Sequence, residues 1–415
     1  MKYYFTVFFL ICCLFCAAQS TKVLDSKDKR IIDLDKAKYP DTCFSASNLY
    51  KSAKIIPLET NASCLIGSID KIQVIDQYIL ILDGYNAKSL FVFDKEGRFV
   101  RKIGSVGQGP GEYNSIGDFT IDRDSKTVYI KDGRASSRIY QYDLTTGKYI
   151  QLVVLERLAG SAGMRSFVSI GGNLYASALF SDHSTNNYLL FSIDEASGKE
   201  KNNFLNVMEY NKGFSNLTGQ SADDRAFFSR ENGEVIFVQP LMNHIIEITK
   251  DGVFSLFELK GKNMLTTEEA KKVHESFNVK RLIESRGGLE RFEIKKYKSI
   301  HSYVEKGEWI KIEMGIGITL HSIMINKKSN EVFVYKCFPN DVLYKITERS
   351  SSFLFGCTDS NGVYYHTSTI RSNGIPELKE FHEAGALSPD VIGLEKIKGL
   401  KDDDNPILLY FEFKE

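Results

Sequence analysis

Hydrophobic positions recur along this chain in short alternating runs that are separated by turns. The clearest copy of the pattern spans residues 69–103, where two apolar runs end at Asp83 and Asp94. Alternation with a period of two between turn residues predicts β-strands. Gly97 lies in the turn that follows Asp94 and can adopt the positive φ that a short hairpin needs. This stretch therefore predicts an antiparallel sheet.

The same unit returns along the rest of the chain. Further copies cover 116–155, 165–205, 225–259, about 309–355 with runs at 331–335 and 342–346, and a weaker copy from about 353. A repeat of roughly 35–45 residues with four strands is typical of a propeller blade. Such sheets bury their faces only by packing on one another around an axis. We predict an all-β fold over 51–415, a six-bladed β-propeller of four-stranded antiparallel blades.

Three segments need a separate interpretation. The apolar run 407–413 has no local partner, so we predict that it pairs with the strand near 55–58 and closes the ring. Residues 264–300 are charged and lack alternation. Thr266 or Thr267 can cap a helix there, which predicts a partly helical insertion between blades four and five. The Pro-containing stretch 371–406 predicts a long loop.

The N-terminus carries the pattern of an export signal. Lys2 precedes an apolar stretch that ends near Phe15, and small residues follow. We predict a signal peptide over 1–18 and an N-terminal extension over 19–50. The apolar stretch is shorter than the ~20 residues of a membrane span, so no transmembrane segment is predicted in the mature chain. A periplasmic or extracellular location follows; an outer-membrane lipoprotein is the alternative, although Cys13 and Cys16 fit a lipidation motif poorly.

Four cysteines follow the predicted cleavage site. They are Cys43, Cys64, Cys337 and Cys357. Export permits disulfides, and closeness in sequence favours the pairs Cys43–Cys64 and Cys337–Cys357. Free buried thiols are the alternative. No two of the four are spaced as a redox or zinc-ribbon pair.

A glycine-rich stretch links the first two copies. It comprises Gly107, Gly109, Pro110, Gly111, Glu112 and Tyr113. A phosphate-binding loop would need a Gly-Lys-Ser/Thr sequence opening a helix, and here a strand follows. We predict a structural crossover between blades, with Tyr113 packed between them.

The residues around this stretch resemble a known family. Residues 57–130, with the Gly104–Tyr113 stretch after a Phe-Asp-x-x-Gly hairpin, are similar to six-bladed β-propellers of the NHL-repeat and TolB-like kind. Bacteroidetes encode many such proteins in exported or lipidated form. The ending 404–410 also resembles that family. The resemblance implies a fold and an exported location, and it implies no activity.

Other candidate chemistry is sparse. The seven histidines are His183, His244, His274, His301, His321, His366 and His382. No two are spaced as a local zinc pair, so no metal or other cofactor is predicted, although His301, His321, His366 and His382 could meet an acid on the axis. Asp402–Asp404 lacks the spacing of a calcium loop. Trp309 is predicted to be a packing anchor, with stacking on a sugar or peptide as the alternative.

Charge and motifs together favour binding over catalysis. Lys plus Arg and Asp plus Glu both number 53, so no general attraction to nucleic acid is predicted. We predict an exported, non-catalytic module that binds a glycan, a peptide or a cell-envelope protein at the axial mouth or at the 264–300 insertion. The alternative is a propeller enzyme, a lyase or hydrolase acting on a glycan or peptide at an axial site. No catalytic residue is predicted by name.

Overall fold

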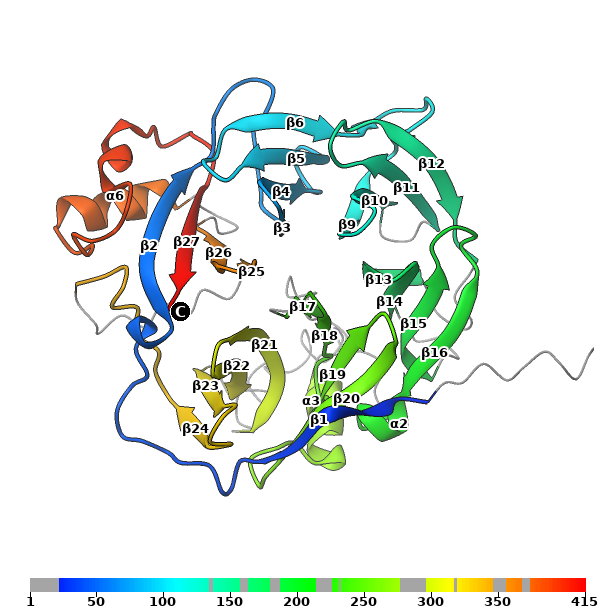
Figure 1. Cartoon of the computed structure of the whole chain (residues 1–415), viewed down its shortest axis with the longest axis vertical. Coiled ribbons are helices and arrows are strands. Elements are labelled where there is room, and N and C mark those ends of the chain that lie inside the picture. Colours follow the sequence, from blue (N-terminus) through cyan, green and yellow to red (C-terminus); the bar gives the residue numbers. More distant parts are fainter. Residues whose placement is uncertain are drawn as a thin grey trace, which may run out of the picture.

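Six sheets stand in a ring around a central axis (Figure 1). A computed structural model of the chain describes residues 22–133, 137–156, 163–179, 187–213, 226–230, 233–276, 296–316, 319–345, 356–367 and 374–415. In these residues five of the blades have four strands and one has five. Most neighbouring strands are antiparallel, which confirms the predicted six-bladed β-propeller.

Blades one to three follow the chain in order. Blade one contains β3 (Lys71–Ile75), β4 (Tyr78–Asp83), β5 (Ser89–Asp94) and β6 (Phe99–Ile103). Blade two contains β9 (Ile116–Asp122), β10 (Thr127–Asp132), β11 (Arg138–Asp143) and β12 (Tyr149–Val154). Blade three contains β13 (Gly163–Ile170), β14 (Asn173–Leu179), β15 (Tyr188–Asp194) and β16 (Glu200–Asn206). The first strand of each blade is nearest the axis and the last is outermost (Figure 1).

Blades four to six are less regular. Blade four contains β17 (Phe227–Ser229), β18 (Val235–Phe237), β19 (His244–Thr249) and β20 (Gly252–Lys260), and β1 (Leu24–Asp33) is added outside β20. Blade five contains β21 (Tyr297–Lys306), β22 (Trp309–Ile316), β23 (Thr319–Asn326) and β24 (Val332–Tyr335). Blade six contains β25 (Gly356–Thr358), β26 (Gly362–His366), β27 (Ile407–Phe413) and β2 (Tyr50–Pro57).

The ring closes as predicted, through the pairing of β2 with β27. The two strands are antiparallel, with Ile55 opposite Leu409 and Ile56 opposite Leu408. Leu408 belongs to an apolar cluster shared with blade one, and Leu409 to one shared with blade five. Alternate side chains of one closing strand therefore fill both neighbouring seams.

The hydrophobic core is divided among the seams between neighbouring blades. In the described residues it consists of six clusters, one for each seam. The cluster between blades one and two contains Leu80 and Val92 from one blade and Phe119 and Ile130 from the next. Burial of both faces of each sheet explains why the strand runs are apolar over several consecutive positions.

Hairpins in the first three blades share an aspartate and a glycine. Asp94, Asp143 and Asp194 each accept backbone N–H groups from the turn that follows. Gly198 has a φ of +75°, and a Cβ there would lie 2.5 Å from the carbonyl oxygen of Val154 in the preceding blade. Its own carbonyl accepts the N–H of Glu156. The turn therefore joins two blades as well as two strands.

The insertion is partly helical, as predicted, but it ends earlier than residue 300. α3 (Thr267–Ser276) begins with a capping box, because the backbone N–H of Glu269 donates to Thr266 Oγ1 and the Glu269 carboxylate accepts the N–H of Thr266. Residues 277–295 lie outside the described residues. β21 already begins at Tyr297, so the last residues of the predicted insertion belong to blade five.

Two further expectations were wrong. In the run 342–346, the described residues 342–345 do not form a strand: Leu343 is fully buried, and its backbone N–H donates to Asn340 Oδ1 in a turn. Tyr344 forms an isolated antiparallel bridge with Leu387 rather than a ladder, and Leu343 is buried by packing in the seam between blades five and six. The predicted long loop contains α6 (Ile375–Glu383) and the 3₁₀ helix η2 (Leu394–Gly399) among its described residues. Pro376 lies in the first turn of α6, where proline is tolerated.

Candidate functional site

The N-terminal segment 22–49, here called the belt, runs along the outside of blades four and five (Figure 1). β1 pairs in parallel with β20 of blade four. Farther along, Lys38 exchanges backbone hydrogen bonds with Val332 and Val334 of β24 in blade five. What was predicted as a simple extension therefore covers the outer edges of two blades before it enters β2.

A disulfide fixes the belt to blade five. Cys43 is bonded to Cys337, which lies 294 positions away in the sequence. The predicted pairs Cys43–Cys64 and Cys337–Cys357 were therefore wrong. Cys64 is buried in the seam between blades six and one, Cys357 is half-buried, and neither belongs to a disulfide. Ring closure brings the belt to the end of blade five, so closeness in sequence did not predict closeness in space.

Aromatic side chains pack around this disulfide. Phe44 contacts Trp309, Tyr335 and Phe338, with ring centroids 5.3 to 6.3 Å apart. Trp309 is half-buried and belongs to the packing between blades five and six, as predicted.

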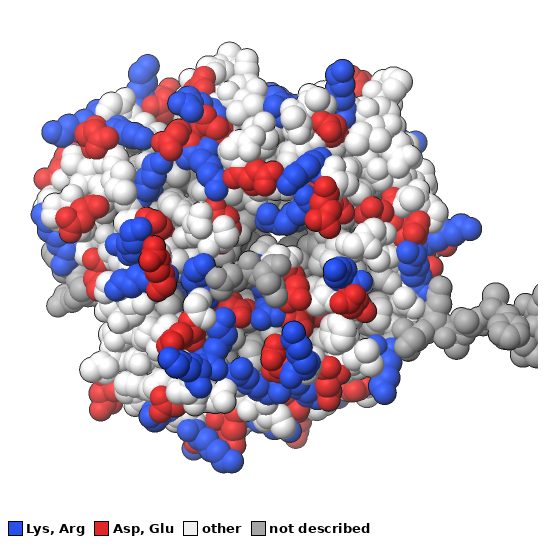
Figure 2. Space-filling model, in the orientation of Figure 1, with Lys and Arg blue, Asp and Glu red and all other residues white. Residues whose placement is uncertain are grey.

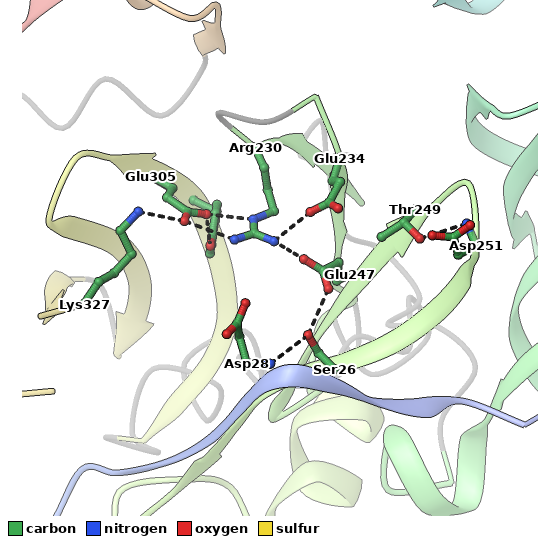
Figure 3. A network of polar contacts seen from close by, with 10 residues as sticks. Ser26, Asp28, Arg230, Glu234, Glu247, Thr249, Asp251, Glu305 and Lys327 are labelled. Carbon is green, nitrogen blue, oxygen red and sulfur yellow. Dashed lines mark hydrogen bonds and ion pairs between the residues drawn. The ribbon is translucent and has the colours of Figure 1, made fainter.

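Arg230 lies at the centre of the densest group of charges in the described residues (Figure 3). Its Nε is 2.7 Å from Glu305 of blade five, and its Nη1 bonds both Glu234 and Glu247 of blade four. Lys327 lies 3.0 Å from the same Glu305. We call Arg230, Glu234, Glu247, Glu305 and Lys327 the charged clamp, because they join blades four and five.

The belt is connected to the charged clamp (Figure 3). Ser26 of β1 donates its hydroxyl to Glu247 at 3.1 Å. The same hydroxyl oxygen accepts the backbone N–H of Asp28. Pairing of β1 with β20 is irregular between Asp25 and Arg30, and this break surrounds Ser26.

Glu305 and Arg230 of the charged clamp keep their charges at neutral pH. Burial alone would raise the pKa of Glu305, but the ion pairs with Arg230 and Lys327 outweigh burial and lower that pKa to about 2. Burial disfavours the charged form of Arg230, and Glu305 reverses this and raises its pKa. Burial also raises the pKa of Tyr303, which donates to Glu305 at 2.9 Å. At neutral pH the clamp can hold two blades together, and Glu305 stays ionised there, so it is a poor proton donor.

The glycine-rich stretch forms a crossover from β6 to β9. β7 (Ser105–Val106) and β8 (Glu112–Tyr113) pair in parallel within it. The carboxylate of Glu112 accepts the backbone N–H of Gly109 at 2.7 Å. An acidic side chain therefore occupies a backbone donor that a phosphate would need.

Tyr113 ends this stretch and is fully buried in the seam between blades one and two. Its hydroxyl donates to the carbonyl of Lys88 at 3.3 Å. The carbonyl of Gly111 accepts from Tyr142 at 2.6 Å. Gly107 lies against the Glu112 carboxylate, and Pro110 is exposed at the tip.

Apolar side chains are exposed beside this crossover. Tyr149 packs its ring against Gly111 and stays 38% exposed. Val106 and Ile150 are 52% and 50% exposed. We call Val106, Tyr149 and Ile150 the crossover patch. Most exposed large apolar side chains of the described residues lie in blades one and two or their connections; these are Leu65, Tyr85, Val100, Val106, Tyr149, Ile150 and Val154.

The histidines lie on separate elements. His301 is on β21, His321 on β23, His366 on β26 and His382 on α6. His321 shares a 3.0 Å hydrogen bond with Tyr297, and burial lowers its pKa. His244 packs against Tyr210 at the end of α2 (Val207–Tyr210), His274 is on α3, and His183 lies outside the described residues. Within the described ranges, no three His, Cys, Asp or Glu side chains are grouped as a metal ion would require.

The acidic run 402–404 also has local partners. Asp402 forms an ion pair with Lys379 of α6 at 2.7 Å. Asp404 accepts the backbone N–H of Lys401.

The face of the molecule in Figure 2 shows Lys, Arg, Asp and Glu intermixed rather than separated by sign.

Six blades closed by the first and last propeller strands define this chain as a six-bladed β-propeller. It belongs to the family described as "Domain of unknown function (DUF4934)", whose model matches residues 29–412. No curated protein matches the chain. None of the described helices is long and apolar enough to cross a membrane.

One solved structure supports the fold. A crystal structure of a "putative exported protein" from Bacteroides fragilis NCTC 9343 superposes with a TM-score of 0.67 at 17% identity, covering 93% of this chain and 100% of that one. A protein of unknown function from Bacteroides thetaiotaomicron VPI-5482 gives a TM-score of 0.30 at 15% identity, over 45% of this chain and 47% of that one. The first of these likenesses shows the propeller architecture.

Proposed function

We propose that this chain is an exported, non-catalytic protein-binding module and that the crossover patch is its contact surface. Two observations support export. The leader 1–18 has the pattern of a signal peptide, and Cys43–Cys337 is a disulfide, which persists in oxidising compartments. The structurally similar protein from Bacteroides fragilis is itself described as a "putative exported protein".

The distribution of exposed apolar side chains carries the proposal. The outer edges of blades four and five are covered by the belt, and β2 of blade six hydrogen-bonds to Ile392. Blades one and two instead present Val106, Tyr149 and Ile150 on a frame held by the buried Tyr113. We take these three side chains as one contact surface, because contiguous exposed apolar groups mark interaction sites. Partly exposed tyrosine on a rigid frame is well suited to bind protein.

The alternative is a propeller enzyme with an axial site. Such an enzyme needs a group that exchanges a proton near neutral pH. The most concentrated charges of the described residues lie in the charged clamp, where ion pairs lower the pKa of Glu305 to about 2. The clamp is therefore better suited to holding blades four and five together than to catalysis. Binding is the function that we favour.

A matched pair of variants tests the proposal. The mature chain, its Val106→Ser/Ile150→Ser variant and a Met208→Ser control are immobilised and exposed to envelope extract from the source organism. Met208 is 75% exposed on α2, outside the crossover patch. We expect one retained protein that the wild type and the control bind equally and that the double variant binds at least ten-fold less. Equal retention by all three, with unchanged melting temperatures, would contradict the proposal.

A further inference from the structure

Lys212 carries a half-buried amine for which the described residues supply no carboxylate partner. Its Nζ donates to the backbone carbonyl of Leu241 at 2.5 Å, and the side-chain oxygen of Asn243 lies 3.5 Å away. Both of these acceptors are uncharged. A positive charge that is taken partly out of water is unfavourable unless an opposite charge compensates it. Within the described ranges, no ion pair compensates the charge of Lys212.

The backbone at Lys212 is also one that a lysine rarely adopts. Lys212 directly follows Asn211, the C-terminal cap of α2, and its φ is +57°. Glycine is the usual residue at this position after a helix, because a side chain there crowds the backbone. Leu241, which accepts the hydrogen bond from Lys212, has a φ of +72°. Both ends of this hydrogen bond therefore hold a conformation that favours glycine, and such strain is concentrated at functional sites.

Burial changes the protonation of this amine. It lowers the pKa of Lys212 to about 8, and no neighbouring charge contributes to the shift. At pH 7 about one Lys212 side chain in ten is therefore neutral, compared with fewer than about one in a thousand for an ordinary lysine. A neutral amine has the lone pair that attacks an electrophilic carbon.

The charged and titratable groups around Lys212 do not restore its charge. His244 of β19 is the nearest of them, and burial lowers its pKa, so its imidazole is mostly neutral at pH 7. Lys212 and Lys29 of β1 lower the pKa of His244 further, whereas Glu258 of β20 and Glu209 of α2 oppose the shift. None of these groups forms an ion pair with Lys212. Burial alone therefore sets the charge of this amine.

We propose that Lys212 is a covalent binding site for an aldehyde ligand, which it holds as an imine. The Nζ lone pair attacks the carbonyl carbon, and the carbon–oxygen bond then breaks. The oxygen leaves as water with the two hydrogens of the neutral amine. No electrons are gained or lost, so the step needs no oxidant or reductant, and water reverses it. The site follows blade three, apart from the crossover patch, and the proposal does not rest on that patch.

Reductive trapping with glyceraldehyde tests the site. The full mature wild-type chain is incubated at pH 7 with glyceraldehyde and cyanoborohydride, which reduces the imine, and peptide mass spectrometry locates the modified lysines. Lys88 and Lys148 are internal controls, since both are exposed and neither forms an ion pair within the described part of the chain. We expect Lys212 to be modified at least ten-fold faster than either control. Equal or slower modification of Lys212 would overturn the proposal.

The pH profile of the trapping is a second measurement on the same chain. The rate at Lys212 divided by the rate at Lys88 or Lys148 cancels the effect of pH on the reagents. We expect this ratio to fall as the pH rises above about 8, because the Lys212 amine is then already mostly neutral. A ratio that stays constant from pH 7 to pH 10 would show that Lys212 reacts as an ordinary lysine and would overturn the proposal.

A matched pair of variants places the reaction at one residue. Lys212→Arg keeps a positive, hydrogen-bonding side chain and removes the nucleophilic amine, so the fast incorporation of glyceraldehyde should disappear. Lys148→Arg is the control and should retain it. Fast incorporation that survives in Lys212→Arg would contradict the proposal. Val106→Ser/Ile150→Ser should leave the trapping unchanged, which separates this test from that of the crossover patch.

Discussion

Blades one to three and blades four to six of this propeller are held together by different kinds of contact. β3 to β6 and β9 to β16 follow one another in order, and each of these blades closes with an aspartate–glycine hairpin. Blade four takes β1, and blade six takes β2, from the N-terminal end of the chain. The inner strands of these two blades, β17 in blade four and β25 in blade six, have three residues each.

The difference shows how a ring tolerates irregular units. Where hairpins and seams are regular, local pairing and packing hold each blade. Where an insertion and short inner strands interrupt the repeat, connections between residues distant in sequence replace them: the disulfide, the charged clamp and the β2–β27 pair. Changes to these connections should therefore affect blades four to six first.

Breaking the disulfide should have the largest effect. Cys43→Ser opens a covalent loop of 294 residues. Chain entropy predicts a loss of about 5–6 kcal/mol of stability for a loop of this length. Thermal unfolding should shift down by several degrees, and hydrogen exchange should rise first in blades four and five. The control is Cys357→Ser, a half-buried thiol outside the disulfide, and an equal shift for both variants would show that the Cys43–Cys337 bond adds no stability.

Removing Arg230, the centre of the charged clamp, should cause the second largest loss of stability. Arg230→Met leaves Glu247 and Glu305 largely buried without their main partner. Removing one partner of a buried ion pair costs about 3 kcal/mol or more. Lys38→Met, which breaks an exposed pair with Glu331, should cost less than about 1 kcal/mol. Denaturant titration compares the two, and similar losses would show that the seam between blades four and five does not depend on the clamp.

The same clamp predicts a dependence on acid. The pKa of Glu305 is about 2 in the folded chain, below its ordinary value of 4.5. A lowered folded pKa means that its contribution is complete above pH 4.5 and is lost as the pH falls toward about 2. The difference in stability between the wild type and Glu305→Gln should therefore shrink over that interval. A difference that stays constant from pH 7 to pH 2.5 would disprove the role of this carboxylate.

Glycine substitutions test the regular blades one to three, and we expect their effect on stability to be the smallest. Gly198 and Gly172 both have a φ of +75°. A Cβ on Gly198 would meet the carbonyl of Val154, whereas one on Gly172 meets nothing within 4 Å. Both alanine variants pay for the backbone conformation, and only Gly198→Ala also strains the seam, by about 1–2 kcal/mol more. Equal unfolding free energies would mean that this hairpin does not join blades two and three.

Much of the fold could be predicted because the information is local. The alternation near Asp83 and Asp94, the glycine of each hairpin and the repeat length all act within one blade. The isolated apolar run 407–413 predicted ring closure for a related reason, since an apolar strand must find a partner. The capping residues of α3, Thr266 and Glu269, are also close together in the sequence, and the helix was predicted from this segment.

The candidate sites were less predictable. Ser26, Arg230 and Glu305 lie in three distant segments, and nothing in the spacing of their residue types indicated that they meet. The only sequence signal for β1 was its position, because its alternating charges resemble a solvated loop. Tyr149 looked like an ordinary strand residue until the crossover placed Gly111 beneath its ring.

The sequence by itself determined the repeating strands, their turns and the closure of the ring, because each depends on hydrogen bonding and burial among neighbouring positions or on a single unpaired apolar strand. Only the tertiary structure decided which cysteines pair, where the belt runs and which charges form the clamp. Those contacts depend on which blades stand side by side, and that arrangement exists only once the whole ring has assembled around its axis.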